Sequence, residues 1–147
     1  MQIDLTKLSE VDILTLTIYG EARGEPIEGQ VAVGNVIANR KKNNKASTYA
    51  EICLAPDQFS CWNENDPNYD ILMKYAGVFE NDQNVSPTDK LLDQCMWVAT
   101  GIISGVVNDN TDGALNYITV NLWKSHCPDW ARDFNLTIGN QIYGTAT

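Results

Sequence analysis

Hydrophobic residues recur at helical spacing near the start of the chain. Ser9 and Asp12 form a Ser-x-x-Asp variant of the capping box, which predicts that a helix begins there. Leu14, Ile18 and Glu21 follow at spacings of four and three residues, so they share one helical face. The face that carries apolar side chains into the core therefore also carries a carboxyl group, in the last turn of the helix.

A second helix is predicted over residues 28–42, EGQVAVGNVIANRKK. Acid at its start and base at its end suit the helix dipole, and its high apolar content predicts a mostly buried central helix. After the polar loop KNNKAS, the stretch TYAEICLAP predicts a short helix that Pro56 stops. Residues 57–84 hold many aspartates and asparagines, so we expect loops there, with a short helix around residues 71–79.

The last predicted helix has Ser86 as its N-cap and Pro87 at its first position, and it ends near Gly105. After the turn NDNTDG, the stretch ALNYITV alternates as a strand does. NLTIGNQIYG is a second short strand candidate with a glycine turn inside it. These elements predict an α+β fold that is mostly α, with a small β element. We see no domain boundary, so residues 1–147 are predicted to form a single domain.

Charge and hydropathy limit the partners of the chain. A net charge of -9 argues against nucleic acid, which needs a basic face, and against electrostatic docking on anionic lipid. The amino terminus lacks the pattern of a secretory signal, and no apolar run is long enough to span a membrane. We therefore expect a product that is made in a cytoplasm without a signal peptide and is not inserted into a membrane. We also expect a monomer.

Cysteine and histidine are too sparse for the usual metal sites. Cys53, Cys61, Cys95 and Cys127 form no C-x-x-C pair, and His126 is the only histidine, so we predict no metal and no cofactor. The acidic stretch NENDPNYD lacks the ligand spacing of an EF-hand and is expected to be a solvated loop. We expect reduced, largely structural thiols. A Cys–His nucleophile is not favoured, because His126 and Cys127 are neighbours in the chain and neighbours rarely point at one another.

Glu21 is the first candidate for chemistry. A carboxyl group on the inner face of a helix is partly desolvated, and the negative end of the helix dipole acts in the same direction. Both effects favour the protonated form, which general acid catalysis on a glycosidic oxygen requires. The alternative is that Glu21 merely ends a helix in solvent, and periodicity alone favours that alternative. We expect Arg23 to pair with Glu25 or Glu28 rather than with Glu21.

Four sequence blocks follow one another between Tyr19 and Tyr143: YGEARGEPIEGQVAVGNVIANR, PDQFSCWNENDPN, DGALNY and WARDFNLTIGNQIYG. They resemble, in the same order, four blocks of the SleB/CwlJ-type cell wall hydrolases: the opening motif, a Gln-Phe-Ser block, a Gly-Ala-x-x-Tyr block and a closing Ile-Gly-x-His-x-Phe/Tyr block. This is the family of spore cortex-lytic enzymes and related phage lysins. Because the blocks cover nearly the whole chain, the resemblance is more specific than any single short motif.

The resemblance implies a compact domain related to lysozyme-like lytic transglycosylases, with Glu21 as the catalytic acid. The residues that it implies in the glycan cleft are Gln58, Phe59, Ser60, Trp62, Asn116 and Tyr117. Tyr19, directly before the Gly-Glu pair, joins Trp62 as a candidate because the C–H faces of sugars stack on aromatic rings.

Two positions depart from the family pattern. Gln141 stands where the closing block usually has a histidine, and Asn116 lies where phage members often have one. If those histidines assist catalysis, their role is altered here; if they are structural hydrogen-bond partners, an amide can replace them. We favour the second interpretation, because acid catalysis by Glu21 needs no histidine, and we count Gln141 among the substrate-binding residues.

The number of carboxylates limits the reaction. Glycosidases that invert, or that use a nucleophile, need two carboxylates at a defined separation. The other candidate acids lie in polar loops, where we expect them to be solvated. They are Glu25, Asp57, Glu64, Asp66 and Asp112.

A mechanism with one acid therefore fits better, and the expected activity is that of a peptidoglycan lytic transglycosylase. Glu21 would protonate the oxygen between MurNAc and GlcNAc, and the C6 hydroxyl would then close on C1 to leave a 1,6-anhydro end. The expected partner is the glycan strand of the cell wall, reached after release from the cytoplasm or from a virion, as by a phage lysin. Three alternatives remain open: lysozyme-type hydrolysis of the same bond, a non-catalytic glycan-binding or virion structural module, and an amidase or peptidase.

Overall fold

The computed structural model describes residues 3–81 and 89–146. Its helices are α1 (Glu10–Ala22), α2 (Ile27–Asn43), α3 (Tyr49–Leu54), α4 (Tyr69–Glu80), α5 (Lys90–Ser104) and α6 (Val120–His126). Short 3-10 turns are η1 (Leu5–Lys7), η2 (Ser60–Trp62) and η3 (Asp129–Ala131). The strands are β1 (Asn116–Thr119), β2 (Leu136–Ile138) and β3 (Gln141–Gly144), which form one small sheet. The predicted fold class, α+β and mostly α, is confirmed.

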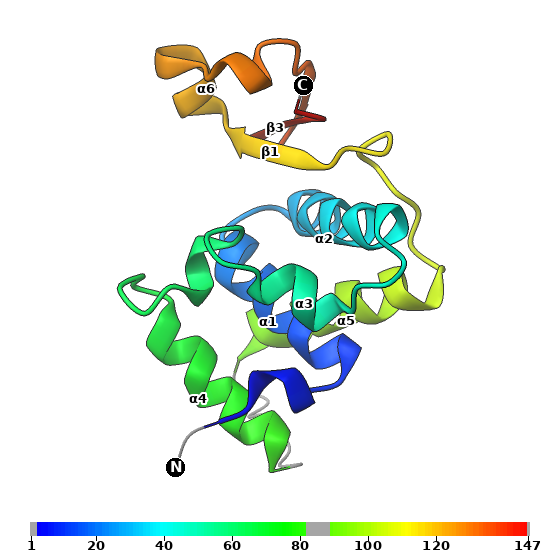
Figure 1. Ribbon diagram of the computed structural model, residues 1–147, viewed down its shortest axis with the longest axis vertical. Coiled ribbons are helices and arrows are strands. Elements are labelled where there is room, and N and C mark those ends of the chain that lie inside the picture. Colours follow the sequence, from blue (N-terminus) through cyan, green and yellow to red (C-terminus); the bar gives the residue numbers. More distant parts are fainter. Residues whose placement is uncertain (1–2, 82–88, 147) are drawn as a thin grey trace.

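Helix α1 is the centre of the helical part. Ser9 caps it by accepting a hydrogen bond from the Asp12 N–H at 3.1 Å, as predicted. Residues 13–19 are all buried, because α2, α3, α4 and α5 pack around the helix (Figure 1). The hydroxyls of Thr15 and Thr17, buried in this stretch, donate to carbonyls one turn earlier, so neither is left without a partner.

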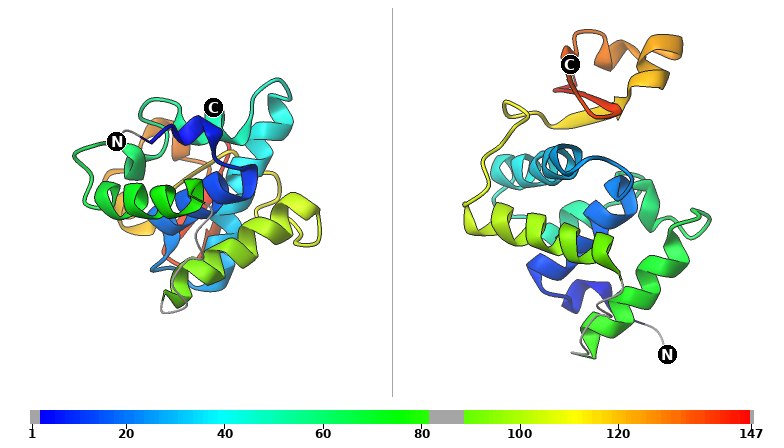
Figure 2. Two further views of the ribbon diagram at one scale, coloured as in Figure 1. Left: turned by 90° about the horizontal axis from the view of Figure 1, so that it is seen from below. Right: turned by 180° about the vertical axis from the view of Figure 1, so that it is seen from behind.

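Helix α2 lies between the other helices and the sheet (Figure 1 and Figure 2). On its helical side, a Cβ at Gly34 would lie 2.5 Å from Ile102 Cδ1, so only glycine allows this close approach to α5. On its other side, Ala32 and Val36 pack against Tyr143 of β3. Burial on both sides agrees with the prediction of a central helix.

Helix α5 is described from Lys90, and Asp89 is its N-cap, accepting from the Leu92 N–H at 3.0 Å. The predicted helix start at Ser86 and Pro87 lies outside the described residues. The predicted end is confirmed: Gly105 adopts the left-handed conformation, with φ +82°, that commonly ends a helix.

The sheet has the strand order β1-β3-β2, and both pairings are antiparallel. In its register, Tyr117 faces Tyr143 and Ile118 faces Ile142. Side chains alternate between the two faces of a strand, so Tyr117, Tyr143 and Gln141 share the face toward α2. Ile118 and Ile142 share the other face, which η3 and the segment after it cover (Figure 1).

The C-terminal predictions hold in outline but not in detail. The strand expected over residues 114–120 is shorter and leads directly into α6, which the sequence pattern did not predict. The reason is Thr119, whose hydroxyl accepts from the Leu122 N–H at 3.2 Å and so caps a helix where the apolar alternation suggested more strand. The strand candidate over residues 135–144 is a hairpin of β2 and β3, turned at Gly139 with φ +59°. Across the described residues, no helix is long and apolar enough to cross a membrane.

Candidate active site

Glu21 is half-buried in the last turn of α1, where it was predicted. The Tyr117 hydroxyl donates to its Oε1 at 2.8 Å, and the Cys61 N–H donates to its Oε2 at 3.2 Å. The carboxyl group therefore lies where α1, η2 and β1 meet. With both oxygens bound to protein donors, Glu21 is not the solvated helix end that was its alternative interpretation.

Gly20 explains how η2 comes so near to α1. A Cβ at Gly20 would lie 2.6 Å from the Cβ of Cys61 and 2.9 Å from Leu72 Cδ1, closer than real contacts allow. The missing side chain lets the Cys61 backbone approach the carboxyl group of the next residue along the helix. Gly24, the second glycine of the motif, has no such neighbour within 4 Å.

Trp62 lies beside Glu21 along α1. Its indole N–H donates to the Thr17 hydroxyl at 3.0 Å, and Thr17 precedes Glu21 by four residues on the same helical face. The indole is half-buried. A partly exposed aromatic ring next to the carboxyl group is a suitable surface for a sugar ring.

Tyr117 is a stable hydrogen-bond donor at neutral pH. Burial first, and then the charge of Glu21, raise the pKa of Tyr117 well above its ordinary value. Its ring packs on that of Tyr143, with the centroids 5.6 Å apart. The phenol is therefore held in place by packing and keeps its proton beside Glu21.

Arg40 belongs to the site, although its sequence context marks it only as part of the basic end of a helix. Its Nε donates to the Leu115 carbonyl at 2.7 Å and its Nη1 donates to Gln58 Oε1 at 3.3 Å. Its guanidinium also lies over the Phe59 ring, 5.0 Å from the centroid. One signal could have revealed it: Arg40 follows Val36 by four residues and so lies on the face of α2 that packs against the sheet.

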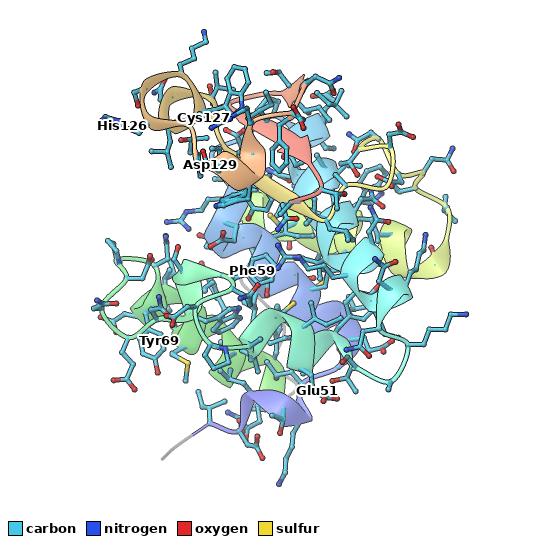
Figure 3. All side chains as sticks on the ribbon, turned by 45° about the horizontal axis from the view of Figure 1, so that its top comes forward. Glu51, Phe59, Tyr69, His126, Cys127 and Asp129 are labelled. Atoms are coloured by element: carbon cyan, nitrogen blue, oxygen red, sulfur yellow. The ribbon has the colours of Figure 1, made fainter. Side chains whose placement is uncertain are left out.

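The Gln-Phe-Ser block contributes to this region in three ways. Phe59 is buried under Arg40 near the middle of the molecule (Figure 3). Gln58 is exposed and bound to Arg40, whereas Ser60 is exposed at the start of η2. The structure thus brings Gln58, Phe59 and Trp62 to the surroundings of Glu21, with Ser60 at the solvent side.

Tyr19 is not brought to Glu21. Its hydroxyl donates to Asp89 Oδ2 at 3.2 Å, and its ring meets that of Tyr75 edge to face at 5.7 Å. Arg23 covers the same ring, with its guanidinium carbon 4.7 Å from the centroid. The expected ion pair of Arg23 with Glu25 or Glu28 is therefore wrong: Arg23 packs on Tyr19 and donates to its carbonyl.

Asn116 and Gln141 lie on different faces of the sheet. Asn116 points to the face opposite Tyr117, and its Oδ1 accepts from the Ala146 N–H at 2.9 Å. Gln141 shares the face of Tyr117, and its buried Oε1 has no hydrogen-bond partner within the described part of the chain. Of these two residues, only Gln141 is on the side of Glu21.

The loop acids differ in their surroundings. Glu25, which was expected to be solvated, is half-exposed and also bound: its two oxygens accept from the backbone N–H and the side-chain amide of Asn140, both at 2.8 Å. It thereby fastens the β2–β3 turn to the loop after α1. The charge of Asp66 helps to raise the pKa of Cys61, the residue whose N–H donates to Glu21. The remaining three acids are exposed: Asp57, Glu64 and Asp112.

The four cysteines are free thiols. Cys53, Cys61 and Cys95 are buried, and burial raises the pKa of Cys53 and of Cys95 to about 12, so these thiols are unreactive. Cys127 is exposed beside His126, at the edge of the molecule and away from Phe59 (Figure 3). Among the described residues, no three His, Cys, Asp or Glu side chains are grouped so that they could hold a metal ion.

A family model described as Cell Wall Hydrolase matches residues 24–144 of the chain. A segment of 32 residues is 56% identical to the spore cortex-lytic enzymes of Oceanobacillus iheyensis and Bacillus subtilis. That segment covers 22% of this chain, but only 12% and 10% of those two proteins.

The fold is similar to that of two solved structures. One is the catalytic domain of the germination-specific lytic transglycosylase SleB from Bacillus anthracis, with a TM-score of 0.61 and 23% identity over 92% of this chain and 93% of that one. The other is the catalytic domain of the Bacillus cereus SleB protein, with a TM-score of 0.57 and 22% identity over 92% and 88%. At these identities the likeness is one of fold. Since the family match covers most of the sequence, the chain belongs to the cell wall hydrolase family.

Proposed function

We propose that this protein cleaves the β-1,4 bond between MurNAc and GlcNAc in peptidoglycan as a lytic transglycosylase, with Glu21 as its single acid and base. The observation that carries the proposal is the Glu21 carboxyl group. It is half-buried, accepts one hydrogen bond on each oxygen, and has no hydrogen bond to a second carboxyl group within the described residues. Membership in the cell wall hydrolase family and the likeness of fold to a lytic transglycosylase domain support the same substrate and reaction.

The reaction needs one proton to be given and one to be taken back. Protonated Glu21 donates its proton to the glycosidic oxygen, and the C1–O bond breaks as positive charge develops at C1. The Tyr117 hydroxyl and the Cys61 N–H stabilise the carboxylate that forms. The C6 hydroxyl then bonds to C1 and loses its proton to Glu21. The enzyme returns to its starting form, the product carries a 1,6-anhydro ring, and no water is consumed.

The surroundings of Glu21 supply the contacts that a glycan needs. Trp62 offers a partly exposed ring, and Gln58 and Ser60 offer exposed polar side chains from the adjoining block. Gln141 lies on the sheet face that carries Tyr117, and its carbonyl oxygen is buried without a partner among the described residues, so a glycan would reach it only if the side chain turned outward. We assign these residues to glycan binding.

Hydrolysis of the same bond is the second candidate. The observation in its favour is Asp66. Of the five loop acids, it is the one whose charge raises the pKa of Cys61, so it lies near the residue whose N–H donates to Glu21. A second carboxylate at this position could direct a water molecule to C1.

Mass spectrometry of the fragments released from purified peptidoglycan tests the two reactions. We expect wild type and Asp66→Asn to release fragments that are lighter than hydrolytic products by one water. Reducing MurNAc ends that disappear in Asp66→Asn would instead establish a lysozyme. New free amino groups without new glycan ends would indicate an amidase or peptidase, and no release from several types of peptidoglycan would indicate a glycan-binding module.

We also propose a role as a phage lysin that is delivered to the wall from a cytoplasm or with a virion. The support is the sequence of the PDQFSCWNENDPN block, which resembles the form in phage and proteobacterial members of the family. The chain expressed in a bacterium should lyse the cell when it is directed across the inner membrane and should not lyse it when retained in the cytoplasm. Lysis that does not depend on export would contradict this role.

A further inference from the structure

We propose that Arg40 is a positioning residue for Glu21: it holds in place the two segments that donate to the Glu21 carboxyl group and adds a positive charge beside it. This inference rests on the proposed role of Glu21 as acid and base. Arg40 itself has no hydrogen bond to Glu21 among its described contacts, so its effect would pass through other groups and through space.

Each contact of Arg40 lies close in sequence to one donor of Glu21. The Leu115 carbonyl, which accepts from Nε at 2.7 Å, precedes Tyr117 by two residues. The Phe59 ring, which the guanidinium covers at 5.0 Å, precedes Cys61 by two residues. Arg40 therefore bridges the beginning of β1 and the beginning of η2, the two segments that converge on Glu21.

The base of this bridge is rigid. Arg40 follows Ala32 and Val36 at four-residue spacing, and these two side chains pack against Tyr143 of the sheet. A guanidinium group is planar and can donate in several directions at once, which lets one side chain bind a carbonyl and an amide while it lies flat on a ring. A lysine at this position could keep the charge but not the whole set of contacts.

The charge of Arg40 lies near the Glu21 carboxyl group. Among the described residues, Arg40 has no carboxylate within ion-pair distance. Burial lowers the pKa of Arg40, whereas the charges of Tyr117, Cys53 and Glu21 act in the opposite direction. Burial raises the pKa values of Tyr117 and Cys53, so the phenol and the thiol stay neutral near neutral pH. The guanidinium stays protonated and favours the carboxylate that forms when Glu21 gives up its proton.

Two substitutions separate the contacts of Arg40 from its charge. In Arg40→Met both are lost, and we expect kcat on soluble peptidoglycan fragments to fall roughly 10- to 100-fold with little change in KM. Loss of the contacts should also shift the NMR resonance of the Cys61 amide proton, because that proton reports on its hydrogen bond to Glu21. Arg40→Lys keeps the charge but not the whole set of contacts, so kcat should stay reduced and the Cys61 resonance should shift in that variant as well. Arg132→Met, which changes the exposed arginine directly after η3, is the matched control and should match wild type in both.

Several results would overturn the proposal. A folded Arg40→Met with the kcat and the Cys61 amide resonance of wild type would do so, and so would a change in KM alone, which would mean a direct contact with the glycan. If Arg40→Met does not fold, Arg40→Lys decides, because wild-type kcat in that variant would rule out a positioning role. The Cys61 amide resonance reports on Arg40 even if wild type cleaves no glycan, so failure of the proposed function and failure of this inference are distinct results.

Discussion

Glu21 is held by groups that are far from it in sequence. Cys61 and Tyr117 lie 40 and 96 residues further along the chain, and each donates to a different oxygen of the carboxyl group. Two donors on different oxygens fix the plane of the group. A fixed plane is what proton transfer to one defined glycosidic oxygen requires.

Tyr117→Phe tests the contribution of one of these donors. The ring keeps its packing on Tyr143, so the stability of the fold should change little. A hydrogen bond to a charged group is worth about 1.5–3 kcal/mol, and we therefore expect kcat to fall roughly 10- to 100-fold. Tyr69→Phe, at the start of α4, is the control and should keep wild-type kcat. Wild-type kcat in Tyr117→Phe would contradict the role given to its hydroxyl.

Asp89 links the stability of the fold to pH. Burial alone would raise the pKa of Asp89, but hydrogen bonds from Tyr75, the Leu92 N–H and Tyr19 outweigh it and hold the pKa below the ordinary 3.8. Because the pKa is lower in the folded state, the stabilisation is complete above pH 3.8 and is lost as the pH falls from there toward the folded pKa.

Urea unfolding at neutral and acidic pH measures this effect. We expect Asp89→Asn to be less stable than wild type at pH 7 and to lose less of its free energy of unfolding on acidification. Asp93→Asn changes an exposed residue in the first turn of α5, the helix that Asp89 caps, and should keep the pH dependence of wild type. Equal pH dependence in Asp89→Asn and wild type would contradict the account.

At the level of elements, the site depends on the contact between α1 and η2. Gly20 lies in α1, and the side chains of Cys61 and Leu72 fill the space that a side chain at this position would occupy. The same contact aims the Cys61 N–H at Glu21. The position of η2 therefore matters for packing and for the carboxyl group together.

Gly20→Ala and Gly24→Ala form a matched pair in one motif. Alanine normally stabilises a helix relative to glycine, by about 1 kcal/mol. At Gly20 the new methyl group would meet the Cys61 side chain, so we expect a loss of roughly 1–3 kcal/mol and reduced glycan cleavage. At Gly24 the new methyl group would meet no atom within 4 Å, so Gly24→Ala should leave both the stability and the glycan cleavage unchanged. Chemical denaturation and a cleavage assay measure the difference, and equal behaviour of the two variants would contradict it.

The sequence predicted the elements that have strong local signals. Ser9 and Gly105 marked helix ends, and apolar spacing located α1, α2 and the body of α5. Helix α6 was missed because Thr119 ends a strand and caps a helix at the same time. Arg40 was missed because its importance depends on which segments α2 meets, and no local pattern contains that information.

The same limit applies to the candidate site. Glu21, Tyr117 and Trp62 were proposed from sequence and converge in the structure. Asn116 was proposed together with its neighbour Tyr117, but adjacent residues of a strand point to opposite faces of the sheet. Assigning the face needs the register with β3, which is a tertiary property.

In the molecule as a whole, the site lies where the helical part meets the sheet. Several hydrogen bonds join the two parts: Arg40 to the Leu115 carbonyl, Asn39 to the Ala114 carbonyl at 3.1 Å, and Asn140 to Glu25. Glu21 belongs to the helical part, and Tyr117 belongs to the sheet. The geometry of the carboxyl group therefore depends on how the two parts are joined.

The distribution of thiols gives a test of the whole fold. Three cysteines are buried in the helical part, whereas Cys127 is exposed after α6. A chromogenic thiol reagent should therefore react rapidly with one thiol per native chain, and with the other three only after denaturation. In Cys127→Ser the rapid reaction should be absent. Rapid reaction of a second thiol in the native protein would contradict the arrangement of the core.

Release of soluble fragments from purified peptidoglycan shows whether Glu21 carries out the cleavage of the glycan. Glu21→Gln should lower the rate by at least roughly 100-fold while the fold is retained, since glutamine cannot donate or accept the proton. Glu28→Gln, which changes an exposed glutamate in the first turn of α2, should match wild type. A folded Glu21→Gln that releases fragments at the wild-type rate would contradict the account.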